Sequence, residues 1–140
     1  MSIIFLDIDG VLVTMNSVSP FVFDPKCVKK LNVILKETDA DIVVSSTWRV
    51  IEPIERLIKK FKVEGVEGRI ISITPVLNGD DNSRGNEIAK WIQENNFKGK
   101  FIVIDDDSDI EPFEKVWVQT TWENGLTDSN VEQAIHLLKG

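Results

Sequence analysis

Two carboxylates, Asp7 and Asp9, stand one residue apart where the apolar run "SIIFL" ends, and Gly10 follows them. Two carboxyl groups in different surroundings can divide a reaction between a nucleophile and a proton donor. Alternate side chains of an extended strand share one face, so we expect the chain to leave the strand near Ile8 or Asp9 and re-aim the second carboxylate. Gly10 supplies the backbone freedom for that turn. The pattern predicts that Asp7 and Asp9 act together.

Polar residues also end two later apolar segments, 41–47 and 100–106. These residues are Ser45, Ser46 and Thr47 in the first segment, and Asp105 and Asp106 in the second, with Asp107 next. Ligands of parallel sheets bind beyond the carboxyl ends of the strands, so these groups would share one crevice with Asp7. Carboxylates that face one another need a counter-ion, and an open site with oxygen ligands favours Mg²⁺. The ion would allow a phosphate group to approach an anionic pocket.

Hydroxyl groups and a cation would complete a phosphate site. We expect the hydroxyl of Ser45 to bind the phosphate, with Ser46 or Thr47 as alternatives. Arg84 is the favoured cation because its helix leads directly into the acidic fourth strand, and Arg49 is the competitor.

A phosphoryl group in this site has a nucleophile beside it. Asp7 would attack phosphorus and form an aspartyl-phosphate. Asp9 would protonate the leaving oxygen and then take a proton from the water that hydrolyses the intermediate.

The elements that must position these residues alternate along the chain. Strands are predicted at 2–8, 41–47, 68–74, 100–106 and 115–121, the last as an edge strand. Amphipathic helices are predicted at 24–38, 52–65, 83–99 and 128–140, the first with Asp24 as N-cap and Pro25 at its first position. This order predicts an α/β fold, a Rossmann-like three-layer sandwich around a mostly parallel five-stranded sheet. Residues 11–23 are predicted to form a flap or loop over the sheet's edge, and no large cap domain is expected.

Size and composition agree with one domain over residues 1–140. The formal charge of −7 disfavours loose attraction of the whole surface to nucleic acid or anionic membrane, but leaves room for a local basic groove.

No apolar run is long enough to span a bilayer and no signal peptide pattern is present, so a cytoplasmic protein is expected. Cys27 is expected to be buried, and His136 to lie on a helix surface.

The segment "FLDIDGVL" resembles the first motif of the haloacid dehalogenase (HAD) superfamily of phosphohydrolases, and the resemblance extends over the chain. "DIVVSST" is similar to the second motif, Arg84 stands where the third has Lys or Arg, and "FIVIDDD" is similar to the fourth. The resemblance implies that the backbone carbonyl of Asp9 joins the carboxylates of Asp7 and Asp105 on Mg²⁺. It carries the superfamily's roles to Asp7, Asp9, Ser45, Arg84, Asp105 and Asp106. "SSTWR", "GRIISITP", "RGNEIAKWI" and "GLT" are similar to a subgroup linked to RNA repair proteins.

The predicted function is that of a Mg²⁺-dependent phosphatase with an open site. In the superfamily, an open site goes with bulky substrates such as a polynucleotide end or a phosphoprotein. Trp48 and Trp122 are candidates for stacking on a base. Trp91 and Trp117 are predicted to be packed, and "LIKKFK" to be a solvated helix face. Two alternatives stay open: a receiver-like signalling module that accepts phosphate on Asp, and a catalytically idle module in which the acidic cluster holds a cation.

Overall fold

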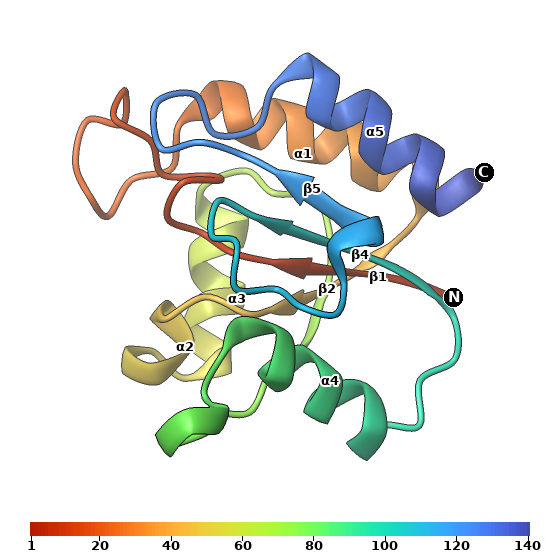
Figure 1. Cartoon of the computed structure of the whole chain (residues 1–140). Helices are drawn as coiled ribbons and strands as arrows, with labels where there is room; N and C mark the ends of the chain where they lie inside the picture. The colour runs from red at the N-terminus through yellow and green to blue at the C-terminus, as the bar shows by residue number, and fades with distance from the viewer.

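The computed structural model describes the backbone of residues 1–140 and all side chains except that of Asp81. Its sheet has five parallel strands in the order β3-β2-β1-β4-β5 (Figure 1). The strands are β1 (Ser2–Leu6), β2 (Asp41–Val44), β3 (Ile70–Ile73), β4 (Lys100–Asp105) and β5 (Trp117–Gln119). The helices are α1 (Pro25–Thr38), α2 (Trp48–Ile51), α3 (Ile54–Val63), α4 (Arg84–Glu94) and α5 (Asp128–Lys139), with short 3₁₀ turns η1 (Gly79–Asp81) and η2 (Glu114–Val116). The predicted α/β fold class is confirmed.

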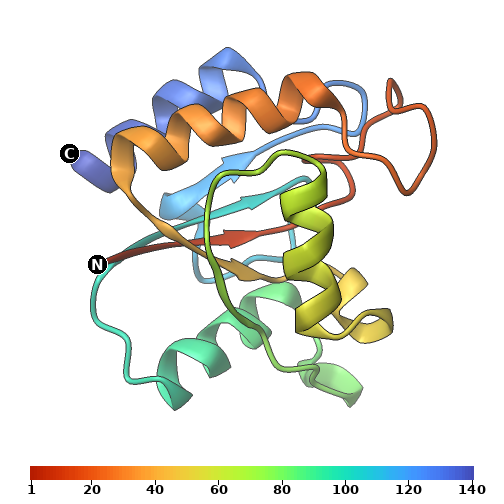
Figure 2. The same ribbon diagram turned by 180° about the vertical axis from the view of Figure 1, so that it is seen from behind.

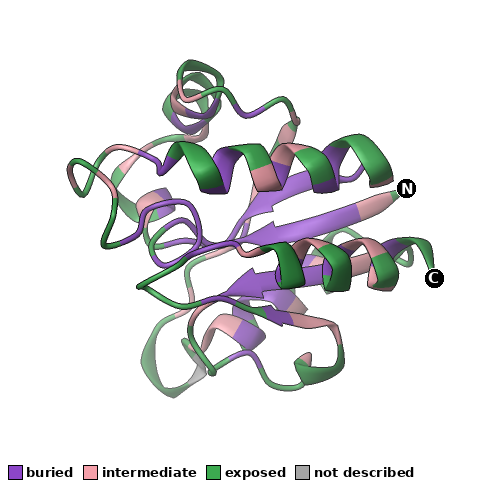
Figure 3. Ribbon diagram, turned by 90° about the horizontal axis from the view of Figure 1, so that it is seen from above, coloured by how far each residue is buried: buried purple, intermediate pink, exposed green. Residues whose placement is uncertain are grey.

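Helices cover both faces of the sheet, which makes three layers. Alternate residues of β1 point to opposite faces: Ile4 and Leu6 pack in a core with α1, α3 and α5, whereas Ile3 and Phe5 pack in a second core with α4. Figure 2 shows the sheet between these helices, and Figure 3 shows buried strands beneath helices whose outer surfaces are exposed. Because the central strands β1 and β2 are covered on both sides, they are apolar except for their first residues, Ser2 and Asp41.

The first helix begins as its sequence predicts. The Asp24 side chain accepts a hydrogen bond from the backbone N–H of Lys26, and Pro25 occupies the first helical position. Cys27 is buried on the inner face of this helix, as expected. His136 is exposed on α5, as expected.

Several predicted boundaries are wrong, mostly because the predicted strands included residues beyond the ends of the apolar runs. β1 ends at Leu6 rather than Ile8, and β2 ends at Val44, after which a short helix that was not predicted, α2, begins at Trp48. The helix predicted to extend to Gly99 ends at Glu94, and Asn96 beyond it adopts a left-handed conformation with φ of 48°. That conformation cannot continue a right-handed helix. β5 is an edge strand, as predicted.

A loop, residues 11–23, follows β1 and projects beyond the carboxyl ends of the strands (Figures 1 and 2). The described residues include no large cap domain, so this loop and α2 flank the end of the sheet where ligands of such folds bind. Of the helices that the structure describes, none has the length and apolar character needed to cross a membrane.

Candidate active site

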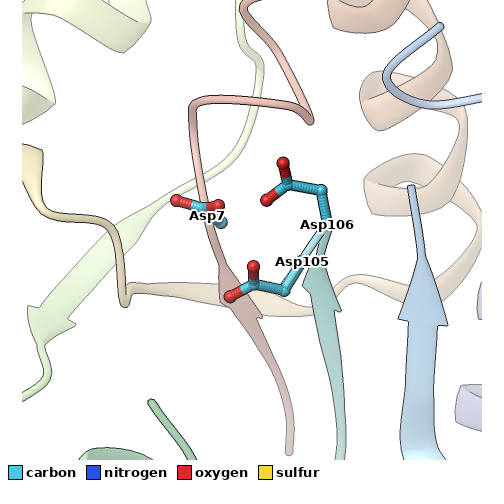
Figure 4. Close-up of side chains that lie close together, drawn as sticks. All are labelled: Asp7, Asp105 and Asp106. Carbon is cyan, nitrogen blue, oxygen red and sulfur yellow. The ribbon is translucent and has the colours of Figure 1, made fainter. Parts of the chain in front are cut away.

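Three carboxylates converge at the carboxyl end of the sheet. Asp7 follows β1, Asp105 ends β4 and Asp106 comes next, and each offers an oxygen within 4.8 Å of the others (Figure 4). The pairing of β1 with β4 brings them together, because Leu6 lies opposite Ile104 and the backbone N–H of Asp7 donates to the carbonyl of Ile104. We call these three residues the carboxylate cluster.

Arg84, the first residue of α4, reaches two members of this cluster. Its Nη1 atom lies 2.8 Å from Oδ2 of Asp105 and 3.3 Å from Oδ1 of Asp7. Burial opposes the charge of the guanidinium group, but attraction by Asp105 and Asp7 outweighs it and raises the pKa of Arg84. A permanent positive charge is therefore held beside the cluster.

One guanidinium group does not compensate the cluster fully. Burial raises the pKa of Asp7 to about 6, although Arg84 lowers it. Burial and the nearby charge of Asp7 raise the pKa of Asp105 to about 8. Asp105 thus retains a proton near neutral pH, and a further cation would displace it.

The chemistry of the cluster fits a hard divalent cation. Its ligands are all carboxylate oxygens, and a site of this kind with room for further ligands suits Mg²⁺. Asp105 and Asp106 are the two members of the acidic run that join Asp7. Asp107 is exposed, and its carboxylate accepts a hydrogen bond from the backbone N–H of Asp109. The carboxylate of Asp109 accepts a hydrogen bond from the backbone N–H of Arg84. These two carboxylates therefore order the loop and the start of α4.

Arg49, the alternative candidate for the phosphate-binding cation, is buried and bonded to other groups. Its side chain is 3% exposed, and Nη2 lies 2.7 Å from Oε1 of Glu87. Its other N–H groups donate to the carbonyls of Ser46, Thr74 and Pro75. Glu87, which lies one turn after Arg84 on α4, was not predicted to be buried. A glutamate on an amphipathic helix is usually exposed, so no local pattern indicated its burial.

The two serines that follow β2 differ in their surroundings. The hydroxyl of Ser46 accepts a bond from the backbone N–H of Trp48 and helps to start α2. The hydroxyl of Ser45 is fully buried and has no hydrogen-bond partner among the described atoms. A buried polar group without a partner is costly, so a ligand oxygen would stabilise it. Thr47 is exposed.

Asp9 lies beside the cluster rather than in it. A tight turn follows β1, in which the carbonyl of Ile8 accepts bonds from three successive N–H groups and Gly10 has φ of 80°. A Cβ atom at Gly10 would collide with the carboxylate of Asp106. The turn leaves Asp9 exposed, with its Oδ2 atom 3.2 Å from the indole nitrogen of Trp48, which donates to it.

The four tryptophans differ in burial, and the predicted packing of Trp91 and Trp117 is confirmed. Trp91 is buried in the core, and Trp117 packs against it from β5 while donating a hydrogen bond to the carbonyl of Asp105. Trp122 is 46% exposed in the loop after β5. Trp48 is half-buried, and its bond to Asp9 could not be predicted because the two residues are 39 positions apart.

Comparison with known proteins agrees with this geometry. A family model described as "HAD domain in Swiss Army Knife RNA repair proteins" matches residues 3–131 of the 140-residue chain. The match includes every residue of the site. A search of the curated proteins finds no match. The chain therefore belongs to the family of HAD domains found in Swiss Army Knife RNA repair proteins.

Proposed function

We propose that this HAD domain is a Mg²⁺-dependent phosphomonoester hydrolase that works through an aspartyl-phosphate on Asp7. Its family indicates a phosphohydrolase in general terms. The observation that carries the more specific proposal is the convergence of Asp7, Asp105 and Asp106 beside Arg84. This arrangement supports the proposal because it would give the reaction a nucleophilic oxygen, oxygen ligands for a cation and a fixed positive charge at one point.

The proposal assigns separate residues to the metal ion and to the phosphate. Mg²⁺ would be held by the carboxylates of Asp7, Asp105 and Asp106 and by the backbone carbonyl of Asp9. When bound, the ion would neutralise charge on the phosphoryl oxygens. The phosphate would be bound by Arg84 and by the hydroxyl of Ser45, with Ser46 as a further ligand. The unpartnered state of the Ser45 hydroxyl supports this assignment.

The reaction then proceeds in two displacements. A carboxylate oxygen of Asp7 forms a bond to phosphorus while the bond from phosphorus to the leaving oxygen breaks, and the carboxyl group of Asp9 gives that oxygen a proton. In the second step the Asp9 carboxylate takes a proton from water, whose oxygen attacks phosphorus. The bond to Asp7 breaks, and inorganic phosphate leaves.

The proposed substrate is bulky, with a polynucleotide end as the first candidate. The absence of a large cap among the described residues leaves the carboxyl end of the sheet open to a large molecule. Membership in a family found in RNA repair proteins points in the same direction. The net charge of −7 implies that any contact with nucleic acid is local.

Hydrolysis of p-nitrophenyl phosphate tests the reaction itself. We expect sustained turnover with Mg²⁺, loss of activity with EDTA, and loss of activity in Asp7→Asn. Asp107→Asn is the matched control, because it removes an exposed carboxylate of the same acidic run and should retain activity. A single stoichiometric phosphorylation without turnover would favour a receiver-like module. No reaction of the folded protein with any phosphoester would leave only cation binding.

A further inference from the structure

A groove opens between the loop 11–23 and helices α2 and α3. It has a volume of about 550 Å³. This volume lies within the range of sites that bind small ligands. Its apolar walls are Phe21 from the loop, Trp48 from α2, and Leu57 and Val63 from α3. Phe21 is 71% exposed and Val63 is 74% exposed. Such exposure of neighbouring large apolar side chains is typical of a surface that meets a partner.

Basic side chains stand along the rim of this groove. Arg56, Lys59 and Lys60 line it together with a single acidic residue, Glu52. Arg56 lies 3.6 Å from Glu52. Lys60 pairs with Glu64 at 2.9 Å, so the charge of Lys59 is the one with no ion-pair partner among the described residues. In a chain with net charge −7, this rim is a local basic surface that suits an anionic ligand.

Trp48 connects the groove to the proposed reaction centre. Trp48 is one of the residues that line the groove, and its indole N–H donates to the Asp9 carboxylate at 3.2 Å. Asp9 is the proposed donor of a proton to the leaving oxygen. The group attached to that oxygen must therefore leave the reaction centre on the side of Asp9, which is the side of the groove.

We propose that the groove binds the nucleobase of the terminal nucleoside of a phosphorylated polynucleotide end, with the rim contacting the next phosphate of the strand. This inference rests on the proposed function, and it identifies the terminal nucleoside as the leaving group of the proposed reaction. Aromatic side chains such as Phe21 and Trp48 provide stacking surfaces for a flat base. Lys59 and Arg56 provide the charge that a backbone phosphate requires. A sugar phosphate would use the reaction centre but would leave the apolar walls uncovered.

A pair of substrates isolates the base. A trinucleotide phosphorylated at its end is compared with the same trinucleotide that is abasic at the phosphorylated position, for both 3′ and 5′ phosphates. We expect the base to raise kcat/KM about tenfold for one of the two ends, in keeping with the effect of stacking a single base. p-Nitrophenyl phosphate is included only to report whether the enzyme is active.

Two variants assign the effect to the groove. Phe21→Ala should reduce the ratio of kcat/KM with and without the base from about ten to near one. Lys59→Gln should raise KM for the trinucleotide and weaken its dependence on salt. The matched controls are Val18→Ala in the same loop and Lys62→Gln on the same helix, both exposed and outside the groove, and both should behave as the wild type.

The outcomes separate this inference from the proposed function. Equal hydrolysis of the two trinucleotides at both ends, or an unchanged ratio in Phe21→Ala, would overturn the assignment of the groove to a base. Turnover of p-nitrophenyl phosphate without hydrolysis of either trinucleotide would also overturn it, while leaving a phosphatase of another substrate class. Inactivity toward every substrate, with the protein folded, would refute the proposed function itself.

Discussion

Replacement of Arg49 by methionine tests whether this arginine is structural, as its contacts indicate, or binds substrate. The side chains of Arg49 and Glu87 are 3% and 8% exposed, and their closest atoms are 2.7 Å apart. Burial lowers the pKa of Arg49, whereas Glu87 raises it. Methionine fills much of the same volume without charge, so the variant leaves the Glu87 carboxylate buried, with the backbone N–H of Leu77 as its only partner among the described residues.

The expected loss follows from these contacts. Removal of one partner of a buried ion pair costs about 3 to 5 kcal/mol, because the remaining charge is uncompensated. The carbonyl groups of Thr74 and Pro75 also lose a side-chain donor, whereas that of Ser46 keeps the backbone N–H of residue 49. We therefore expect a loss of about 4 kcal/mol or more. Glu87→Gln should cost less, about 1 to 2 kcal/mol, since Arg49 keeps its carbonyl acceptors. The double variant Arg49→Met with Glu87→Leu should be more stable than the sum of the single losses predicts.

Urea unfolding followed by the fluorescence of the four tryptophans measures these losses. For a slope of about 2 kcal/mol per molar urea, Arg49→Met should move the midpoint down by about 2 M. A loss below about 1 kcal/mol would refute the buried ion pair. A stable Arg49→Met protein with a strongly raised KM would show instead that Arg49 binds the phosphate, and that the assignment to Arg84 is wrong.

Three further predictions concern the carboxylate cluster. Arg84→Met should lower kcat/KM for p-nitrophenyl phosphate about 10² to 10³-fold, whereas Arg84→Lys should retain part of the activity. Without divalent cations, the protein should lose stability as pH rises from 5.5 to 8, because the folded state holds protons on Asp7 and Asp105, whose unfolded pKa is 3.8. Between these pH values Asp105 accounts for most of the loss, roughly 3 kcal/mol, because Asp7, with a folded pKa of about 6, has already lost most of its contribution below pH 5.5; urea unfolding measures the total. Gly10→Ala should destabilise the protein by at least about 1 kcal/mol, because an L-residue is strained in a left-handed conformation. It should also raise the Mg²⁺ concentration needed for half-maximal activity, because φ at this position is 80° and the new Cβ atom would displace Asp106.

Each of these predictions has an outcome that contradicts it. Wild-type kinetics in Arg84→Met would remove this residue from the phosphate site. Stability that is flat or rises between pH 5.5 and 8 without metal would mean that Asp7 and Asp105 are ionised in the folded state. Mg²⁺ should reduce the loss at pH 8, since it favours the ionised carboxylates. Unchanged Mg²⁺ activation in Gly10→Ala would place Asp106 outside the metal site.

Local patterns were sufficient for the five strands, the four longer helices and their order, but not for the short helix α2. Asp24 and Pro25 predicted the start of α1 because capping depends on neighbouring residues. The ends of elements were harder, since the predicted strands included residues that lie in the turns after β1 and β2. Ile8, Ser45 and Ser46 are as buried as the strands that they follow, so burial alone does not mark where a strand ends.

For the site, the sequence by itself determined which residue types end the strands, and so predicted that Asp7, Asp105 and Asp106 would meet. That prediction was within reach because parallel strands place their carboxyl ends at one edge. Only the tertiary structure decided that Arg84 contacts the cluster while Arg49 is buried against Glu87, and that Trp48 joins Asp9 to a basic groove. These contacts link residues far apart in the chain, so their partners depend on how helices pack on the sheet, which no local pattern records.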